Sequence, residues 1–423
     1  MLKQRPEGGL KNALRDLFDQ RKKYLDSLCG SLSPAYIFEP EVLRRRAEAF
    51  QAAFLGRFSA CGFYFAVKSN NYPLVAKTLI QSSFGLDVSG SAELALALRL
   101  GVEDIFFTGP GKTDEELRLA VKNHKKITVL IDSVHELKAL QGLAEANKTS
   151  IRAGVRFNTK PFGPWGKFGI PLDRLDFFFR ESERCAAVDL QGLQFHTSWN
   201  HTPRAQAEVI RLLGQKLKNC PPDVRARIKF LDVGGGYWPE SGQWFLNGRR
   251  ALYGPKARAT VLPRRFYSSC PIGYFAERLS GVVRRHLGGL TGLRVCFEPG
   301  RWICQDSMHL LMTVTDKKAH DLVITDAGIN AIGWERFVKN YFPILNLSRP
   351  SLSEKACQIA GSLCCPDDVF GFSYFGSGIR AGDVLLIPWQ GAYAYSLRQE
   401  FIKPAPRVLT ARCRYAAKKG KRS

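Results

Sequence analysis

Residues 38–303 alternate short apolar runs with longer stretches of helical periodicity. The apolar runs are continuous, as in parallel strands that are buried on both faces. Eight such runs follow one another: "FYFAVK", "FGLDVS", "DIFFTGP", "ITVLID", "RAGVRFN", "GLQFHTS", "IKFLDVGGG" and "LRVCFEP". Eight strands with intervening helices favour an α/β fold, a parallel (β/α)8 TIM barrel, and an open doubly wound sheet is the alternative.

The pattern changes after Arg301, where short β-rich runs with turn residues replace the helical stretches. This texture predicts an all-β domain, of sandwich or barrel type, over 304–412. The run "PAYIFE" at 34–39 predicts a strand before the barrel, so we expect the N-terminal segment 1–37 to join the β domain. Residues 413–423 form a basic tail.

The 423 residues carry a formal net charge of +24, with 62 Lys and Arg against 38 Asp and Glu. No zinc-finger spacing, aromatic RNA-binding signature or basic zipper accompanies this charge, so nucleic-acid binding is disfavoured. The 11 cysteines contain no CxxC pair and indicate neither a disulfide framework nor a metal site. No stretch reaches about 18 apolar residues, so we expect a cytoplasmic protein without a membrane partner.

Polar residues close several of the predicted strands. Lys68 ends the first, and lysine is rarely buried unless its charge has a partner, although its side chain can also snorkel to water. Active-site residues of a TIM barrel gather at these carboxyl ends. The other polar strand ends are Asp87, Arg156, His196, Gly234–Gly236 and the "EPGR" run Glu298–Arg301.

These strand ends suit one cofactor. Gly234–Gly236 let backbone N–H groups approach an anion closely, and Arg301 adds a guanidinium suited to phosphate. A lysine, a phosphate cradle and a buried acid together suggest pyridoxal 5′-phosphate (PLP), with Lys68 as the Schiff-base residue and Glu298 on the pyridine nitrogen. The flat imidazole of His196 is suited to pack on the face of the ring.

Ten landmarks occur in order: "YFAVKSNN", "FGLDVSGSAELALAL", "GVRFN", "KFGI", "LQFHTSWN", "LDVGGGY", "FEPGR", "ITDAGIN", "GSLCCPDDVF" and "AGDVLLIPWQGAYA". On these motifs the chain resembles the fold-type III PLP-dependent decarboxylases, the group of diaminopimelate and ornithine decarboxylases. The resemblance covers nearly the whole chain, from residue 35 to residue 410. It implies a TIM barrel with a β domain, PLP as cofactor, and amino-acid decarboxylation.

The resemblance also implies roles for individual residues. Lys68 resembles the Schiff-base lysine, and His196 resembles the histidine that stacks on the cofactor. Asp87 and Arg156 resemble a pair that organises the lysine side of the pocket, and Tyr393 resembles a tyrosine that touches the phosphate. The implied cofactor-binding residues are Lys68, Asp87, Arg156, His196, Gly234, Gly235, Gly236, Glu298, Gly300, Arg301 and Tyr393.

Family members are homodimers with two shared active sites, which implies a role for "GSLCCPDDVF". Cys364 resembles the thiol that acts in catalysis with Lys68 and His196, and Cys365 competes for this role because a one-residue slip would exchange the two. Asp368 would face Lys167 of the partner subunit across the interface.

The chain also departs from the family pattern. After the histidine the family has a small residue and then a phosphate-binding serine, whereas this chain has Thr197, Ser198 and Trp199, so either Ser198 substitutes or the loop differs. Cys365 and Trp334 replace residues that grip the distal end of diaminopimelate, and Arg336 substitutes only if its loop shifts. We therefore expect meso-diaminopimelate to be a poor substrate.

A long basic and aromatic stretch at 237–270 follows the glycine turn. It either meets a carboxylate-bearing or carrier-linked substrate or is a solvated excursion. The expected function is decarboxylation of a small-molecule amino acid that is basic, D-configured or a conjugated diamino acid. The alternatives are a PLP-dependent racemase, which needs two opposed bases, and a non-catalytic PLP-binding protein.

Overall fold

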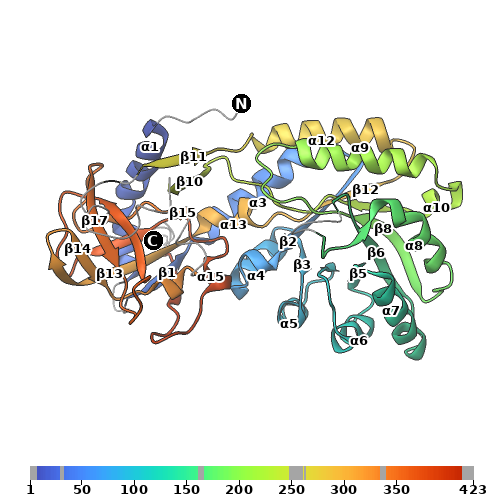
Figure 1. Ribbon diagram of the computed structural model, residues 1–423, viewed down its shortest axis with the longest axis horizontal. Coiled ribbons are helices and arrows are strands. Elements are labelled where there is room, and N and C mark those ends of the chain that lie inside the picture. The colour runs from blue at the N-terminus through green and yellow to red at the C-terminus, as the bar shows by residue number, and fades with distance from the viewer. Residues whose placement is uncertain are drawn as a thin grey trace, which may run out of the picture. The chain divides into compact units, whose positions relative to one another are not determined.

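The computed structural model describes residues 7–28, 33–160, 166–246, 261, 263–333 and 340–411. The chain forms two compact units, which Figure 1 shows in ribbon form. The barrel unit comprises Arg44–Glu240 and Ser269–Ile303, and the β-rich unit comprises Met1–Leu43, Ser241–Ser268 and Cys304–Ser423. The continuous barrel range 38–303 expected from the sequence therefore differs from the compact unit, because Ser241–Ser268 groups with the β-rich unit.

Eight parallel strands form the barrel. They are β2 (Ala60–Ala66), β3 (Gly85–Val88), β4 (Ile105–Phe107), β5 (Ile127–Ile131), β6 (Ile151–Asn158), β8 (Val188–Gln194), β9 (Phe230–Asp232) and β12 (Arg294–Phe297). The sheet closes because β12 pairs with both β9 and β2, and β5 pairs with β6. This closure confirms the predicted TIM barrel and excludes the open sheet. A short strand, β7 (Ile170–Pro171), lies outside the ring and pairs with β6.

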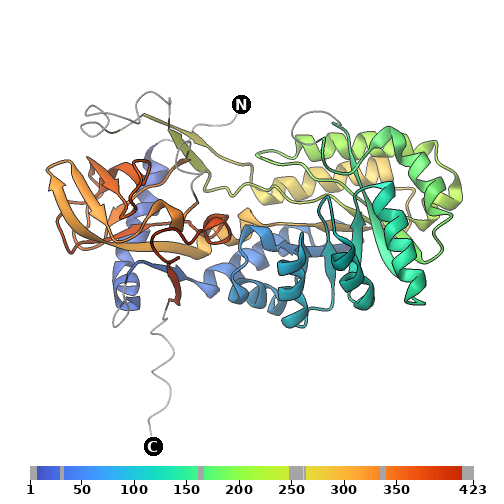
Figure 2. The same ribbon diagram turned by 60° about the horizontal axis from the view of Figure 1, so that its bottom comes forward.

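Helices follow most of the barrel strands. Their bounds are α3 (Pro40–Phe54), α4 (Pro73–Gln81), α5 (Ser91–Arg99), α6 (Asp114–Lys122), α7 (Val134–Ala146), α8 (Leu175–Ser182), α9 (Arg204–Lys218), α10 (Pro222–Arg227), α12 (Ile272–Leu287) and α13 (Arg301–Cys304), with 3-10 turns at η1 (Val67–Ser69) and η2 (Leu172–Arg174). Helices α9 and α12 run side by side in both views (Figures 1 and 2). None of these or the other described helices is long and apolar enough to cross a bilayer.

An apolar layer fills the middle of the barrel. Tyr64 and Phe106 stack with their ring centroids 3.8 Å apart, and Phe230 packs beside them. Gly154 and Gly192 leave the space that the Phe230 ring occupies, because a Cβ atom at either position would overlap that ring. The barrel is therefore a packed core and not a pore.

The β-rich unit is built around the 12-residue strand β13 (Met308–Ala319), which pairs with β1 (Ala35–Phe38), β14 and β19. Its other elements are β14 (Leu322–Thr325), β16 (Leu345–Asn346), β17 (Glu354–Ala360), β18 (Val369–Phe375), β19 (Val384–Ile387), β20 (Arg407–Thr410), η3 (Gln305–Ser307), η4 (Ile329–Ala331) and α15 (Ala394–Leu397). Strand β1 lies between β13 and β20, which confirms the predicted N-terminal strand and its place in the β domain.

Two N-terminal helices, α1 (Glu7–Asp19) and α2 (Arg21–Ser27), precede this strand. Neither helix was predicted from the sequence. The apolar positions of α1, from Leu10 to Phe18, recur at helical spacing and pack on a core that includes Leu311. The charged residues between these positions made the segment look uniformly polar.

Part of the basic stretch 237–270 forms a hairpin of β10 (Gln243–Leu246) and β11 (Arg264–Tyr267), and β10 also pairs with β15 (Asn340–Tyr341). Arg264 donates two hydrogen bonds to Glu354, at 2.7 and 2.9 Å, and Tyr341 donates to the same carboxylate. Arg264 thus anchors the hairpin to Glu354. Residues 247–260 and 262 lie outside the described residues.

Candidate active site

A polar layer lies one strand step beyond the apolar layer, toward the carboxyl ends of the strands. Side chains two residues apart on a strand share a face. The side chain two positions after each residue of the apolar layer therefore also points into the barrel. Seven strands carry a polar side chain at this position. The eighth, β2, carries Ala66 there, and Lys68 comes two residues later. The seven polar residues are Asp87, Thr108, Asp132, Arg156, Gln194, Asp232 and Glu298.

Lys68 and Asp87 form an ion pair in this layer. The Nζ of Lys68, on the turn that ends β2, lies 2.7 Å from Oδ2 of Asp87. Thr108 donates its hydroxyl hydrogen bond to the other oxygen of Asp87 at 2.6 Å, and Asp87 is buried. The Lys68 side chain is 40% exposed, so its amine has both a charged partner and access to the mouth of the barrel.

Two buried acids lie on the neighbouring strands β9 and β12. Glu298 accepts a hydrogen bond from Gln194 at 3.4 Å, and Asp232 accepts one from the backbone N–H of Gly234 at 2.9 Å. Burial, and the negative charge of Asp87, raise the pKa of Glu298. Burial, and the adjacent Glu298, raise the pKa of Asp232 well above its usual range. A cationic ring nitrogen at this place would offset the repulsion between the acids, which fits the acid expected beside the pyridine of PLP.

The glycine turn has no room for side chains. Gly234 and Gly236 have φ angles of 67° and 77°, and a Cβ atom at Gly235 would overlap the backbone oxygen of Glu298. At Gly300, a Cβ atom would come within 2.9 Å of the Ser69 side chain. Both loops are therefore close-packed turns that only glycine allows. Successive backbone N–H groups in such turns are suited to bind an anion, which fits the phosphate of PLP.

Asn200 holds the neighbouring loop against this turn. Its Nδ2 donates to the carbonyl oxygens of Thr197 and Gly235, and its backbone N–H donates to Gly236, each at 3.0 Å. Asn200 was not predicted as a site residue, because a single asparagine gives no signal of a contact 35 residues away along the chain. Ser198 lies in this loop, between Thr197 and Asn200.

His196 and Arg156 lie beside a cavity of about 300 Å³ that Ser198 also lines. Burial and the positive charges of Lys68 and Arg156 hold the pKa of His196 well below its usual range. The ring is therefore neutral near pH 7, as suits a group that packs on a flat cofactor. The guanidinium of Arg156 lies 4.5 Å from the ring centroid of Phe168, so the "KFGI" segment packs against the site.

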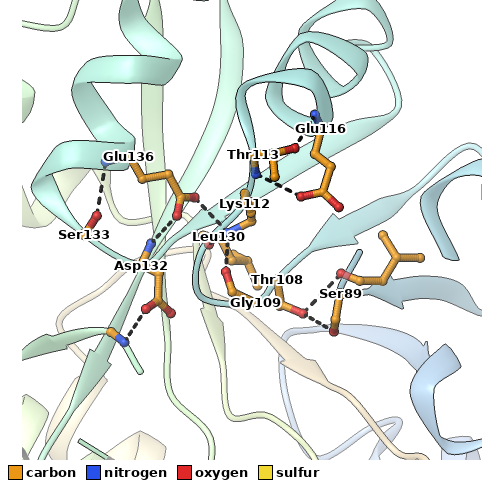
Figure 3. Close-up of polar contacts among 12 residues, drawn as sticks. Ser89, Thr108, Gly109, Lys112, Thr113, Glu116, Leu130, Asp132, Ser133 and Glu136 are labelled. Carbon is orange, nitrogen blue, oxygen red and sulfur yellow. Dashed lines mark hydrogen bonds and ion pairs between the residues drawn. The ribbon is translucent and has the colours of Figure 1, made fainter. Parts of the chain in front are cut away.

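A buried network of hydrogen bonds around Lys112 and Glu136 supports the polar layer (Figure 3). Lys112 donates to the carbonyl oxygens of Gly109 and Leu130 and to Glu136, at 2.8 to 2.9 Å. Glu136 in turn accepts the backbone N–H of Asp132, and Asp132 accepts the backbone N–H of Gly169 in "KFGI" at 2.8 Å. The network ties the ends of β4 and β5 to the segment that packs on Arg156.

Replacing Lys112 with methionine should cost about 3–5 kcal/mol of unfolding free energy, because Glu136 would be left as an unpaired buried charge. The Lys112 and Glu136 side chains are only 2% and 7% exposed. The matched control is Lys126→Met, which breaks a pair with Glu103 whose side chains are 35% and 77% exposed and should cost below about 1 kcal/mol. Equal losses of the two variants in urea unfolding would contradict this account.

The remaining expected site residues lie elsewhere in the chain. In the β-rich unit, Cys364 is exposed and Cys365 is half-buried. Tyr393 has a positive φ of 66°. In the barrel unit, Lys167 is exposed. Trp334 and Arg336 lie outside the described residues.

Asp368 has contacts within its own chain. It is buried, and its two oxygens accept the backbone N–H groups of Ile329 and Leu363, each at 2.6 Å. Burial raises the pKa of its carboxyl. Asp368 therefore holds the turn that presents Cys364, and its pairing with Lys167 of a partner chain stays a prediction.

Comparisons with known proteins agree with this arrangement. The sequence model of the family described as "Pyridoxal-dependent decarboxylase, pyridoxal binding domain" matches residues 41–305. The 2-[(L-alanin-3-ylcarbamoyl)methyl]-2-hydroxybutanedioate decarboxylase of Staphylococcus aureus is 26% identical over 80% of this chain and 84% of its own length. The diaminopimelate decarboxylase of Methanothermobacter thermautotrophicus is 26% identical over 90% of this chain and 87% of its own. The L-glutamyl-[BtrI acyl-carrier protein] decarboxylase of Niallia circulans is 25% identical over 80% of this chain and 79% of its own.

Solved structures share the fold. The diaminopimelate decarboxylase of Helicobacter pylori complexed with L-lysine has a TM-score of 0.74 at 22% identity, covering 92% of this chain and 93% of that chain. The lysine/ornithine decarboxylase of Vibrio vulnificus complexed with putrescine has a TM-score of 0.73 at 19% identity, covering 93% and 98%.

Diaminopimelate decarboxylases are thus among the relatives, so the expectation that meso-diaminopimelate is a poor substrate is not borne out. The enzyme class and the cofactor inferred from the strand ends are confirmed. Because the family match covers more than half of the chain and coincides with the barrel and its polar layer, this protein belongs to the pyridoxal-dependent decarboxylases.

Proposed function

We propose that this enzyme decarboxylates a conjugated amino acid, in which an amino-acid unit is joined to a larger acid or carrier. Two relatives are named for such substrates, a hydroxybutanedioate conjugate and a glutamyl group on an acyl-carrier protein. Decarboxylation as the reaction is supported by the polar layer, which places the Lys68 amine and two buried acids at one end of the barrel.

The roles of the chain's residues follow from their positions. Lys68 binds the cofactor, and Asp87 orients the Lys68 amine. Glu298 holds the proton on the ring nitrogen. When bound, PLP supplies an electron sink for the pair left by loss of the α-carboxylate. The glycine turn and Arg301 bind the phosphate through N–H donors, and neutral His196 packs on the ring. The Lys68–Asp87 ion pair, the buried Glu298 and the neutral His196 support these roles, and the family match supports the cofactor.

We further propose a homodimer with shared active sites, in which Cys364 of one subunit delivers a proton to the α-carbon in the site of the other. Cys364 is suited to this role because it is exposed on a turn that Asp368 holds in place. Tyr393 is proposed as an additional phosphate contact.

A CO2-release screen with PLP-loaded enzyme tests the substrate class. The substrates are citryl-linked diamino acids, a carrier-linked amino acid, meso-diaminopimelate, and D- and L-ornithine and lysine. We expect the largest kcat/KM for a conjugate. A free amino acid that is turned over at least about tenfold more efficiently, a difference of ~1.4 kcal/mol, would overturn the proposed class. Interconversion of enantiomers without CO2 release would identify a racemase instead.

A further inference from the structure

Three groups stack beside the glycine turn. The Arg301 guanidinium carbon lies 4.4 Å from the ring centroid of Trp238. The Trp238 ring stacks in turn on Trp199, with centroids 5.0 Å apart and planes 20° apart. Trp238 is only 5% exposed, whereas Trp199 is 60% exposed. The buried Trp238 ring thus contacts the Arg301 guanidinium, the exposed Trp199 indole and also the His201 ring, whose centroid lies 5.2 Å away.

Backbone contacts fix Trp238 beside the glycine turn. Trp238 lies two residues after Gly236, and its N–H donates to the carbonyl oxygen of Asn200 at 3.3 Å. Asn200 itself is bonded to Gly235 and Gly236, as described above. Trp199 adopts a φ of 59°, a conformation that is sparsely populated for a bulky residue and costs free energy. The surrounding contacts hold this strained residue where its ring meets Trp238.

We propose that Trp199 and Trp238 are positioning residues for Arg301, which orient its guanidinium toward the phosphate of PLP. A guanidinium over an aromatic face is attracted by the ring while its N–H donors stay in its own plane, where a phosphate takes them in pairs. This inference rests on the proposed placement of PLP at the glycine turn.

The test measures dissociation constants of the apoenzyme for PLP and for pyridoxal, which lacks the phosphate, by absorbance titration. Trp238→Leu should weaken PLP binding about two- to thirtyfold, the range of a cation–π contact from an exposed to a desolvated site. Pyridoxal binding should change much less. Trp238→Phe keeps an aromatic face and should recover most of the affinity. Trp199→Ala, at an exposed position, should weaken PLP in the same direction by a smaller factor.

A double-mutant cycle separates positioning from general packing. In an Arg301→Met background, Trp238→Leu should have little further effect on PLP affinity, because the residue through which it acts is gone. An equal loss in both backgrounds, or equal losses for PLP and pyridoxal, would overturn the inference. Wild-type protein that binds no PLP would instead overturn the proposed site, so the two failures are distinguishable.

Discussion

Lys68→Ala should abolish turnover, with a loss of at least about a thousandfold in kcat/KM, as when a covalent nucleophile is removed. The reason is positional. Lys68 reaches the polar layer from the end of β2, where its amine lies 2.7 Å from the buried Asp87. Lys112 is the buried lysine on the neighbouring β4–α6 loop. Its amine donates hydrogen bonds to two carbonyl oxygens and Glu136, so it is not placed to bind the cofactor.

Lys68→Arg is the matched control. It keeps a positive charge beside Asp87, but a guanidinium stays protonated and cannot act as an amine nucleophile. We therefore expect Lys68→Arg to fold normally and to be as inactive as Lys68→Ala. If either variant kept more than a few per cent of the wild-type rate, the cofactor would be held by another residue.

The second large effect is recovery of activity by mixing two inactive variants. If Cys364 acts across a subunit boundary, Lys68→Ala and Cys364→Ala should complement each other. Each heterodimer would hold one doubly altered site and one wild-type site. With random exchange half of the dimers are heterodimers, so about a quarter of all sites should recover, by the statistics of a symmetric two-site dimer.

This mixing experiment needs two supporting measurements. Cys364→Ala must be strongly impaired alone, and subunit exchange must be shown independently, for example with differently tagged chains. Cys365→Ala is the control, because the neighbouring thiol should be dispensable if Cys364 is the catalytic one. Exchange without recovery would show that each site is built from one chain.

The barrel was predictable because its strands are continuous apolar runs that end on polar residues. Lys68, Asp87, Arg156 and Glu298 were all found as strand ends, and the structure places the last three in the polar layer and Lys68 at the turn after β2. Asp132 and Asp232 belong to the same layer and were missed. Their inward direction follows from the two-residue period of a strand, which can be read only when the strand registers are known.

Other features depended on contacts that sequence patterns do not encode. The pairing of β10 with β15 joins segments almost 100 residues apart, so nothing local indicated that Arg264 meets Glu354. Helix α1 was different, because the spacing from Leu10 to Phe18 did carry a helical signal that its charged residues obscured.

Borohydride reduction of the PLP-loaded enzyme, followed by proteolysis and mass spectrometry, identifies the lysine that holds the cofactor, since reduction fixes PLP to that lysine. If Lys68 holds PLP at the carboxyl end of the barrel, the peptide that contains Lys68 should carry a phosphopyridoxyl group, and Lys68→Ala should lose it. A label on a different lysine, or no label on protein that was exposed to excess PLP, would contradict this role of Lys68.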